Sequence, residues 1–136
     1  MPVYRHQLPQ LAGDVFLTDG GIETTLIYDD GFDLPDFAAF PLLDDAAGHA
    51  ALQGYFDAYL DVAVRHQVGI VLETPTWRAS PDWAARQSYS GERLIEVNQS
   101  AVDLLVAARH RWERPDTPVV ISGCIGPRGD ATTPRS

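Results

Sequence analysis

Three short apolar runs stand out along the chain. They extend from Val15 to Thr18, from Val68 to Glu73 and from Val119 to Ile125. None of the runs alternates apolar with polar residues, and each is rich in β-branched side chains. Continuous runs of this kind are typical of strands that are buried on both faces, as in parallel sheets. The pattern therefore predicts three strands of a parallel sheet.

Helical periodicity fills the two intervals between these runs. From Ala46 to His66, and again from Gly91 to Trp112, apolar residues recur with the spacing of an amphipathic helix. The two stripes consist of Leu52, Tyr55, Phe56, Tyr59 and Ala63, and of Leu94, Val97, Ala101, Leu105, Ala108 and Trp112. The tripeptide from Ser80 to Asp82 predicts a further short helix, with its serine as N-cap and its proline at the first position. The order β-α-β-α-β predicts an α/β fold with crossover helices.

The segments that follow the first two strands are much longer than those that lead into the next strand. Asp19 to Asp45 and Thr74 to Ser90 are the long segments, whereas Gln67 and Glu113 to Pro118 are the short ones. The longer segments thus lie at the carboxyl ends of the strands, where α/β proteins carry their active sites. We expect the first long loop to cover a site, because long loops in compact domains are commonly functional. We expect its acidic residues to form a solvated face: Asp29, Asp30, Asp33, Asp36, Asp44 and Asp45.

The overall composition limits the partners of this protein. A chain of 136 residues, 45% of them hydrophobic, is sufficient for one globular domain spanning residues 1–136. A net charge of −9 argues against nucleic acid or an anionic membrane as a partner. Neither a transmembrane run nor the apolar core of a signal peptide occurs. A single cysteine excludes an internal disulfide and fits a reducing, cytoplasmic location.

The first strand ends in Asp19, Gly20 and Gly21. A carboxylate at a strand end can pair with a ligand ammonium group. Two glycines allow consecutive backbone N–H groups to converge on an anion. Together these residues suit a zwitterionic amino acid. The alternative is a tight turn without a ligand, because Asp-Gly pairs are common in turns.

Polar residues also follow the second strand, and a glycine-containing turn follows the third. Glu73, Thr74 and Thr76 offer hydrogen-bonding groups beside Trp77, which can form an apolar wall. Alternatively, the threonines cap backbone groups at the strand end. The segment from Gly126 to Gly129 forms a turn that lets a ligand approach the backbone, or a plain turn after a strand.

The remaining nucleophilic and metal-binding residue types give weaker signals. Cys124 is expected to be a small buried thiol, because a single cysteine lacks the paired spacing of a zinc site and no histidine neighbours it. The histidines are expected at the surface or in helix packing: His6, His49, His66 and His110. No phosphate-binding loop, dinucleotide fingerprint, nucleophile elbow or HExxH motif occurs.

Taken together, the three strand ends resemble the homocysteine S-methyltransferase family. The resemblance lies in LTDGGIETTL after the first strand, ETPTWRAS after the second and ISGCIGPRGD around the third, and it covers most of residues 15–130. It implies a (β/α)₈ TIM barrel, of which this chain provides the N-terminal part, about three βα units. It also implies methionine biosynthesis, by methyl transfer to the thiol of homocysteine from S-methylmethionine, betaine or S-adenosylmethionine.

The same resemblance implies roles for individual residues. Asp19 would hold the amine of homocysteine, and the amides of Gly20 and Gly21 would hold its carboxylate. Glu23 and Thr24 would support the first loop. The other residues implied to form the pocket lie on the second and third loops: Thr74, Thr76 and Gly126.

In this family a zinc ion binds the homocysteine thiol and holds it as thiolate. The zinc ligands are cysteines from the later half of the barrel, so we expect zinc in the complete protein but no metal ligand in this chain. The chain, which stops at Ser136, is then expected to be inactive alone. Its open sheet edges favour docking with the missing C-terminal barrel portion or self-association. The alternatives are a non-catalytic, truncated interaction fragment and a TIM-barrel enzyme that acts on a different small zwitterion.

Overall fold

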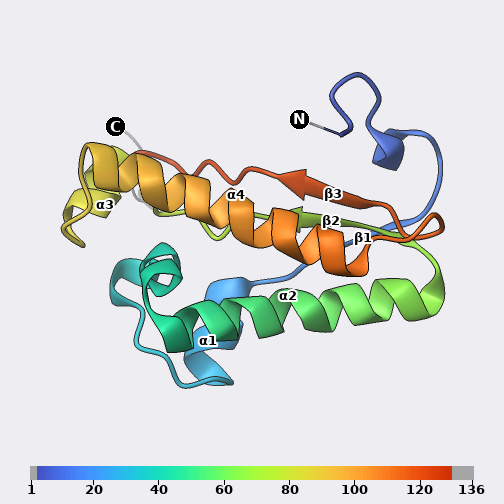
Figure 1. The fold of residues 1–136 in the computed structure, drawn as a ribbon. Coiled ribbons are helices and arrows are strands. Elements are labelled where there is room, and N and C mark those ends of the chain that lie inside the picture. The colour runs from blue at the N-terminus through green and yellow to red at the C-terminus, as the bar shows by residue number, and fades with distance from the viewer. Residues whose placement is uncertain (1–2, 130–136) are drawn as a thin grey trace.

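Three parallel strands form the centre of the structure, a computed structural model that describes residues 3–129 (Figure 1). They are β1 (Phe16–Thr18), β2 (Gly69–Glu73) and β3 (Val119–Ser122), and they lie in the order β1-β2-β3. The prediction of an α/β fold with parallel strands is therefore confirmed. Within the described residues the sheet is open, with β1 and β3 at its edges.

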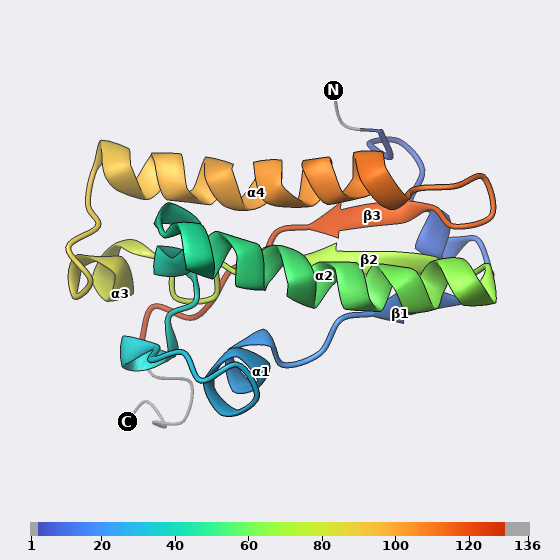
Figure 2. The ribbon, with the colours of Figure 1, turned by 60° about the horizontal axis from the view of Figure 1, so that its bottom comes forward.

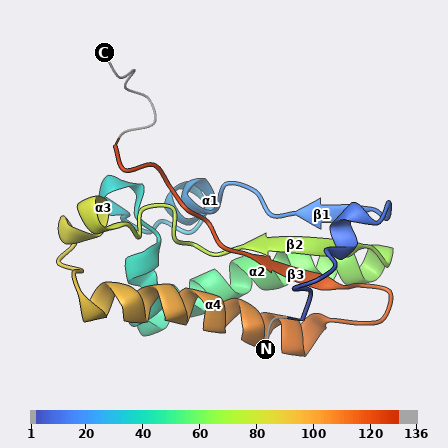
Figure 3. The ribbon, with the colours of Figure 1, turned by 90° about the horizontal axis from the view of Figure 1, so that it is seen from above.

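Two long helices, α2 (Ala46–His66) and α4 (Glu92–Trp112), cover one face of this sheet (Figures 2 and 3). Their bounds agree with those predicted from the apolar periodicity. The core lies between the helices and the sheet, and it includes the fully buried residues Leu52, Phe56, Leu60, Leu105, Ile70, Leu72 and Val119. Burial of these side chains supplies most of the stabilisation that holds helices and strands together.

Local chemistry sets the ends of α2. The carboxylate of Asp45 accepts a hydrogen bond from the backbone N–H of Gly48 at 2.7 Å, which caps the first turn. At the other end, Gln67 adopts a left-handed conformation with φ of 52° and terminates the helix. The chain then enters β2 directly, so the short return predicted from the sequence is present.

The segment predicted as a long first loop contains helical structure, and this part of the prediction was wrong. It holds α1 (Ile22–Tyr28) and the 3₁₀ helices η2 (Pro35–Phe37) and η3 (Phe40–Asp44). Ile22 and Leu26 are the buried residues of α1 and form the side that faces the core. The helix is too short for a clear periodicity, and the two threonines between these residues have low helix propensity.

One strand boundary and one helix cap differ from those predicted. The strand β3 ends at Ser122, and Ile125, predicted as part of the apolar run, is 96% exposed. The helix α3 (Pro81–Ala85) begins where expected, but the Ser80 side chain makes no capping hydrogen bond. Its buried hydroxyl has no hydrogen-bond partner within residues 3–129. Asp130, the last residue of the third motif, lies outside the described residues.

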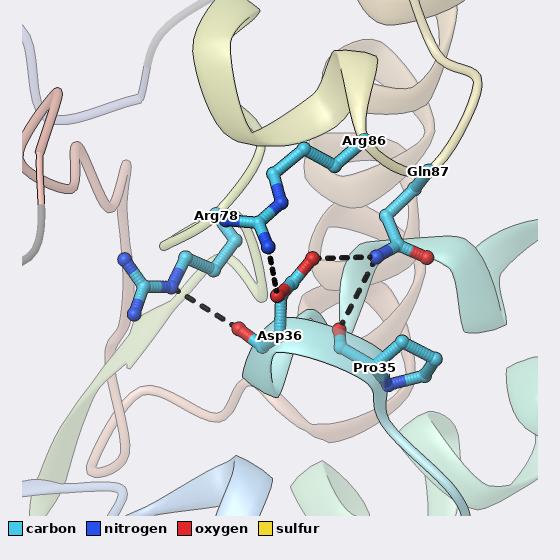
Figure 4. Close-up of polar contacts among 5 residues, drawn as sticks. All are labelled: Pro35, Asp36, Arg78, Arg86 and Gln87. Atoms are coloured by element: carbon cyan, nitrogen blue, oxygen red, sulfur yellow. Dashed lines mark hydrogen bonds and ion pairs between the residues drawn. The ribbon is translucent and has the colours of Figure 1, made fainter.

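Five of the six acidic residues of the first long segment are exposed, as predicted: Asp29, Asp30, Asp33, Asp44 and Asp45. Asp36 is half-buried, and three of the six also make contacts within the protein. Asp45 caps α2, Asp44 accepts a hydrogen bond from the hydroxyl of Tyr89 at 2.6 Å, and Asp36 pairs with Arg86 at 3.2 Å (Figure 4). These contacts fix the segment on the neighbouring helices. Figure 2 shows that α1, α3 and the loop after β3 gather beyond the carboxyl ends of the strands. Within the described part of the chain, no helix has the length and apolarity needed to cross a bilayer.

Candidate functional site

Asp19 lies directly after β1 and connects three elements at the carboxyl edge of the sheet. Its Oδ1 accepts a hydrogen bond from the backbone N–H of Glu73 at 3.2 Å, and its Oδ2 accepts one from the hydroxyl of Tyr55 at 3.5 Å. Burial raises the pKa of Asp19, and the N–H of Glu73 opposes this effect. The carboxylate is thus held in one orientation by β2 and α2.

A small cavity of about 170 Å³ opens beside this carboxylate. It is lined by Asp19, Gly20, Ile22, Glu23, Glu73, Thr74, Trp77 and Cys124. The structure therefore brings together four of the residues predicted to bind a substrate, together with Trp77 as the apolar wall. Four other predicted residues do not line this cavity: Gly21, Thr24, Thr76 and Gly126.

Three carboxylates give the cavity a negative character. They belong to Asp19, Glu23 and Glu73. Burial raises the pKa of Glu23, and the charge of Asp19 adds to this increase. Burial also raises the pKa of the Cys124 thiol, as do the same three carboxylates. The thiol therefore stays protonated at neutral pH, and the cavity favours a cationic group.

Thr74 and Thr76 join the end of β2 to the loop after β3. The hydroxyl of Thr76 donates to the carbonyl of Cys124 at 2.8 Å, so its oxygen accepts from the hydroxyl of Thr74 at 2.7 Å. The backbone N–H of Cys124 donates to the oxygen of Thr74 at 3.0 Å. Each hydroxyl has only one proton, so both protons are used within the protein. The backbone-capping role that the sequence left open for the threonines is present.

The glycines after β1 have different surroundings. The N–H of Gly20 donates to the hydroxyl of Tyr55 at 3.1 Å. A Cβ atom at Gly20 would lie only 2.7 Å from the hydroxyl of Tyr59, so a larger residue would require the Tyr59 side chain to shift. Gly21 is the N-cap residue of α1. The two amides predicted to hold a carboxylate are therefore not equivalent, because the first already has a partner.

Tyr55 belongs to this site, although the sequence indicated only a member of the apolar stripe of α2. The helix runs antiparallel to the strands, so its first half lies near their carboxyl ends (Figure 1). Burial and the charge of Asp19 raise the pKa of Tyr55, so its phenol keeps the proton that it donates to Asp19. The sequence did contain a signal for this contact: a tyrosine in an apolar stripe indicates a polar partner nearby, because a buried hydroxyl requires one.

The loop after β3 passes close to the second loop. A Cβ atom at Gly126 would overlap the backbone carbonyl of Trp77, so this close approach requires glycine. Cys124 is half-buried and lines the cavity, whereas the sequence predicted a buried core thiol. Thr24 is exposed on α1. The histidines are exposed, as predicted: His6, His49, His66 and His110.

The donor groups around the cavity do not fit a metal ion. Among residues 3–129 there is no group of three or more histidine, cysteine, aspartate and glutamate side chains that could hold one. Cys124 lies beside carboxylates, which disfavour its thiolate form. The described site therefore provides charge and hydrogen bonds for a small ligand, but no set of zinc ligands.

Comparison with known families gives a match over most of the chain. The family described as homocysteine S-methyltransferase matches residues 16–135. Neither the curated proteins nor the solved structures include a significant match. The matched range begins at β1 and includes every element that contributes to the cavity.

Proposed function

The chain belongs to the homocysteine S-methyltransferase family, and we propose that its cavity binds homocysteine for methylation at sulfur. The observation that carries this proposal is the fixed carboxylate of Asp19 in a cavity that also contains Glu23 and Glu73. A negatively charged cavity favours an ammonium group, which homocysteine provides next to its carboxylate.

Asp19 is the proposed partner of the substrate ammonium group. Each of its oxygens accepts one hydrogen bond from the protein, at 3.2 Å from Glu73 and at 3.5 Å from Tyr55. A carboxylate oxygen has two acceptor positions, so each oxygen retains one for the ligand. Because the side chain is already oriented, less conformational entropy is lost when the ligand binds.

The other predicted residues have supporting roles in this proposal. Gly21 offers its amide to the substrate carboxylate, and Gly20 lets the chain pass Tyr59. Glu23 adds negative charge. The residues that shape the surrounding loops are Thr24, Thr74, Thr76 and Gly126. The threonine pair does so by fixing the third loop against β2.

We propose that the chemical step needs groups beyond residues 3–129. In the complete family member a zinc ion would hold the homocysteine thiol as thiolate, with ligands from outside residues 3–129; within these residues no group of three or more histidine, cysteine, aspartate and glutamate side chains could hold a metal ion. The described chain then supplies substrate binding rather than methyl transfer by itself. The methyl donor is a small molecule such as S-methylmethionine, betaine or S-adenosylmethionine.

Calorimetric titration of the full chain tests this proposal. We expect homocysteine to bind more tightly than 4-mercaptobutanoate, which lacks the ammonium group. Asp19→Asn should weaken homocysteine binding by about tenfold or more, because a charged partner is lost. Asp14→Asn, at an exposed position before β1, is the matched control for the change in net charge. Equal affinity of wild type and Asp19→Asn would contradict the proposal.

A further inference from the structure

Two tyrosines of α2, Tyr55 and Tyr59, approach the turn that follows β1. They lie one helical turn apart, and their ring centroids are 5.1 Å apart. Tyr55 is only 7% exposed, and its ring makes an edge-to-face contact with the fully buried ring of Phe56. Packing of this kind fixes the orientation of an aromatic ring. The hydroxyl of Tyr55 is therefore held at a fixed place near the carboxyl end of β1.

The Tyr55 hydroxyl contacts both residues of this turn. Its oxygen accepts a hydrogen bond from the backbone N–H of Gly20 at 3.1 Å. Its proton is donated to Oδ2 of Asp19 at 3.5 Å. A phenol has one proton, so the Gly20 N–H occupies the acceptor side of the hydroxyl and the proton is directed to the carboxylate. Tyr55 thus restrains the backbone and the side chain of the turn together.

The carboxylate of Asp19 is held from two sides. The backbone N–H of Glu73 lies 3.2 Å from Oδ1, and the hydroxyl of Tyr55 lies 3.5 Å from Oδ2. Both contacts are longer than the usual hydrogen bond, so they orient the group more than they bind it tightly. Contacts of this length in a binding site commonly shorten when the ligand is in place.

Tyr55 acts on this site without lining its cavity. The cavity residues include Asp19 and Gly20 but not Tyr55. Tyr55 lines a separate groove, formed by residues of α1, α2 and the segment between them. Its effect on a ligand in the cavity therefore passes through Asp19 and Gly20.

The titratable groups near the turn come from four segments of the chain. They are Glu23 of α1, Tyr55 and Tyr59 of α2, Glu73 of β2, and Cys124 in the loop after β3. Burial raises the pKa of Asp19, and the charge of Glu73 adds to this increase, whereas the hydrogen bond from Tyr55 lowers it. Arg78 lowers the pKa of Glu23. Within residues 3–129, Tyr55 is the only side chain that donates a hydrogen bond to Asp19.

We propose that Tyr55 is a positioning residue for Asp19, which it holds in the orientation and the charged form that a substrate ammonium group requires. This proposal rests on the proposed function. A protonated or rotated carboxyl group at Asp19 would lose the attraction for an ammonium group. A single hydroxyl, placed by the packing of α2 on the sheet, opposes both changes.

Calorimetric titration of the full chain with homocysteine, from acidic to neutral pH, compares wild type with Tyr55→Phe. We expect the variant to bind about three- to tenfold more weakly at neutral pH. Loss of the hydroxyl raises the pKa of Asp19, so its carboxylate takes up a proton at higher pH. The decrease of affinity on acidification should therefore begin at higher pH in the variant than in wild type.

Tyr89→Phe is the matched control, because it removes another buried tyrosine hydroxyl that donates to an aspartate. Tyr89 is 4% exposed and donates to Asp44 at 2.6 Å, outside the cavity. This variant should keep both the affinity and the pH profile of wild type. A merely structural role of Tyr55 would weaken binding equally at every pH, and parallel profiles in folded Tyr55→Phe would overturn the proposal.

A second measurement needs no ligand. The pKa of the Asp19 carboxyl, followed by NMR, should be higher in Tyr55→Phe than in wild type and Tyr89→Phe. Phenylalanine keeps the ring that packs on Phe56, and circular dichroism checks the fold. An unchanged pKa of Asp19 would refute the role of Tyr55, while homocysteine binding by wild type would still support the proposed function. Absence of homocysteine binding would contradict the proposed function, and the pKa of Asp19 would then still test the contact with Tyr55.

Discussion

The threonine pair at the end of β2 and the arginine that follows it are all buried, yet their polar atoms differ in one respect. Thr74 and Thr76 use both hydroxyl protons within the protein, in bonds of 2.7 and 2.8 Å. Arg78 leaves Nη1 without a partner among the described residues. The fold therefore satisfies the hydroxyl groups of the threonine pair by itself, but it leaves one nitrogen of Arg78 without a hydrogen-bond partner among the described residues.

The largest expected effect on stability comes from breaking the hydrogen bonds of the threonine pair. Thr76→Val removes the donor to the Cys124 carbonyl and the acceptor for the Thr74 hydroxyl, so a partly buried carbonyl and a buried hydroxyl proton lose these partners. We expect the free energy of unfolding to fall by about 2–3 kcal/mol. Urea unfolding followed by circular dichroism measures this change. Thr24→Val, at an exposed site, is the control. An equal loss of unfolding free energy in both variants would contradict a stabilising role for the hydrogen bonds of Thr76.

A smaller effect on stability is expected when the guanidinium group of Arg78 is removed. Arg78→Met keeps an unbranched side chain between the two tryptophan rings and eliminates a buried charge without a charged partner. Such replacements are often neutral or stabilising, so without ligand the unfolding free energy should change by about 1 kcal/mol or less. A loss as large as that of Thr76→Val in the same urea experiment would show that Arg78 is a structural connection too.

The smallest expected effect is a pH dependence at Glu23. Burial raises its pKa above the ordinary value of 4.5, so the folded state holds the proton at pH values where the unfolded state has released it. Stability contributed by this group therefore decreases as pH rises above 4.5 towards the raised pKa. Glu23→Gln removes the titration, so its stability relative to wild type should be higher at neutral pH than at acidic pH.

Thermal unfolding across this pH range checks the prediction for Glu23. Glu96→Gln, on the exposed side of α4, is the control for the loss of one negative charge. A relative stability of Glu23→Gln that does not change with pH would show that this carboxyl does not titrate differently in the folded chain.

Much of the fold follows from the periodicity of the sequence, because the buried surfaces of long elements repeat. The helices Ala46–His66 and Glu92–Trp112 were predicted in this way, the second of them from Gly91, whereas the three parallel strands were predicted from continuous apolar runs. The helix Ile22–Tyr28 was not, because one short buried side gives little periodicity. Its threonines also weaken the local preference for a helix.

The site was predictable only in part, for a related reason. Residues at the carboxyl ends of adjacent parallel strands must meet, so the proximity of Asp19, Glu73 and Thr74 follows from the order of the strands. The contact of Tyr55 with Asp19 depends on the register of a helix against the sheet. The position of Arg78 between two tryptophans depends on how the segment after β2 folds back onto α3, which contains Trp83. Sequence patterns carry little information about either arrangement.

Titration of homocysteine into wild type and Asp19→Asn tests the central claim most directly, because Asp19 is the one predicted residue that connects β1, β2 and α2 at the cavity. The account predicts binding to wild type and a loss of about tenfold or more in the variant, with Asp14→Asn unchanged. Homocysteine affinity that is the same in all three proteins would contradict it.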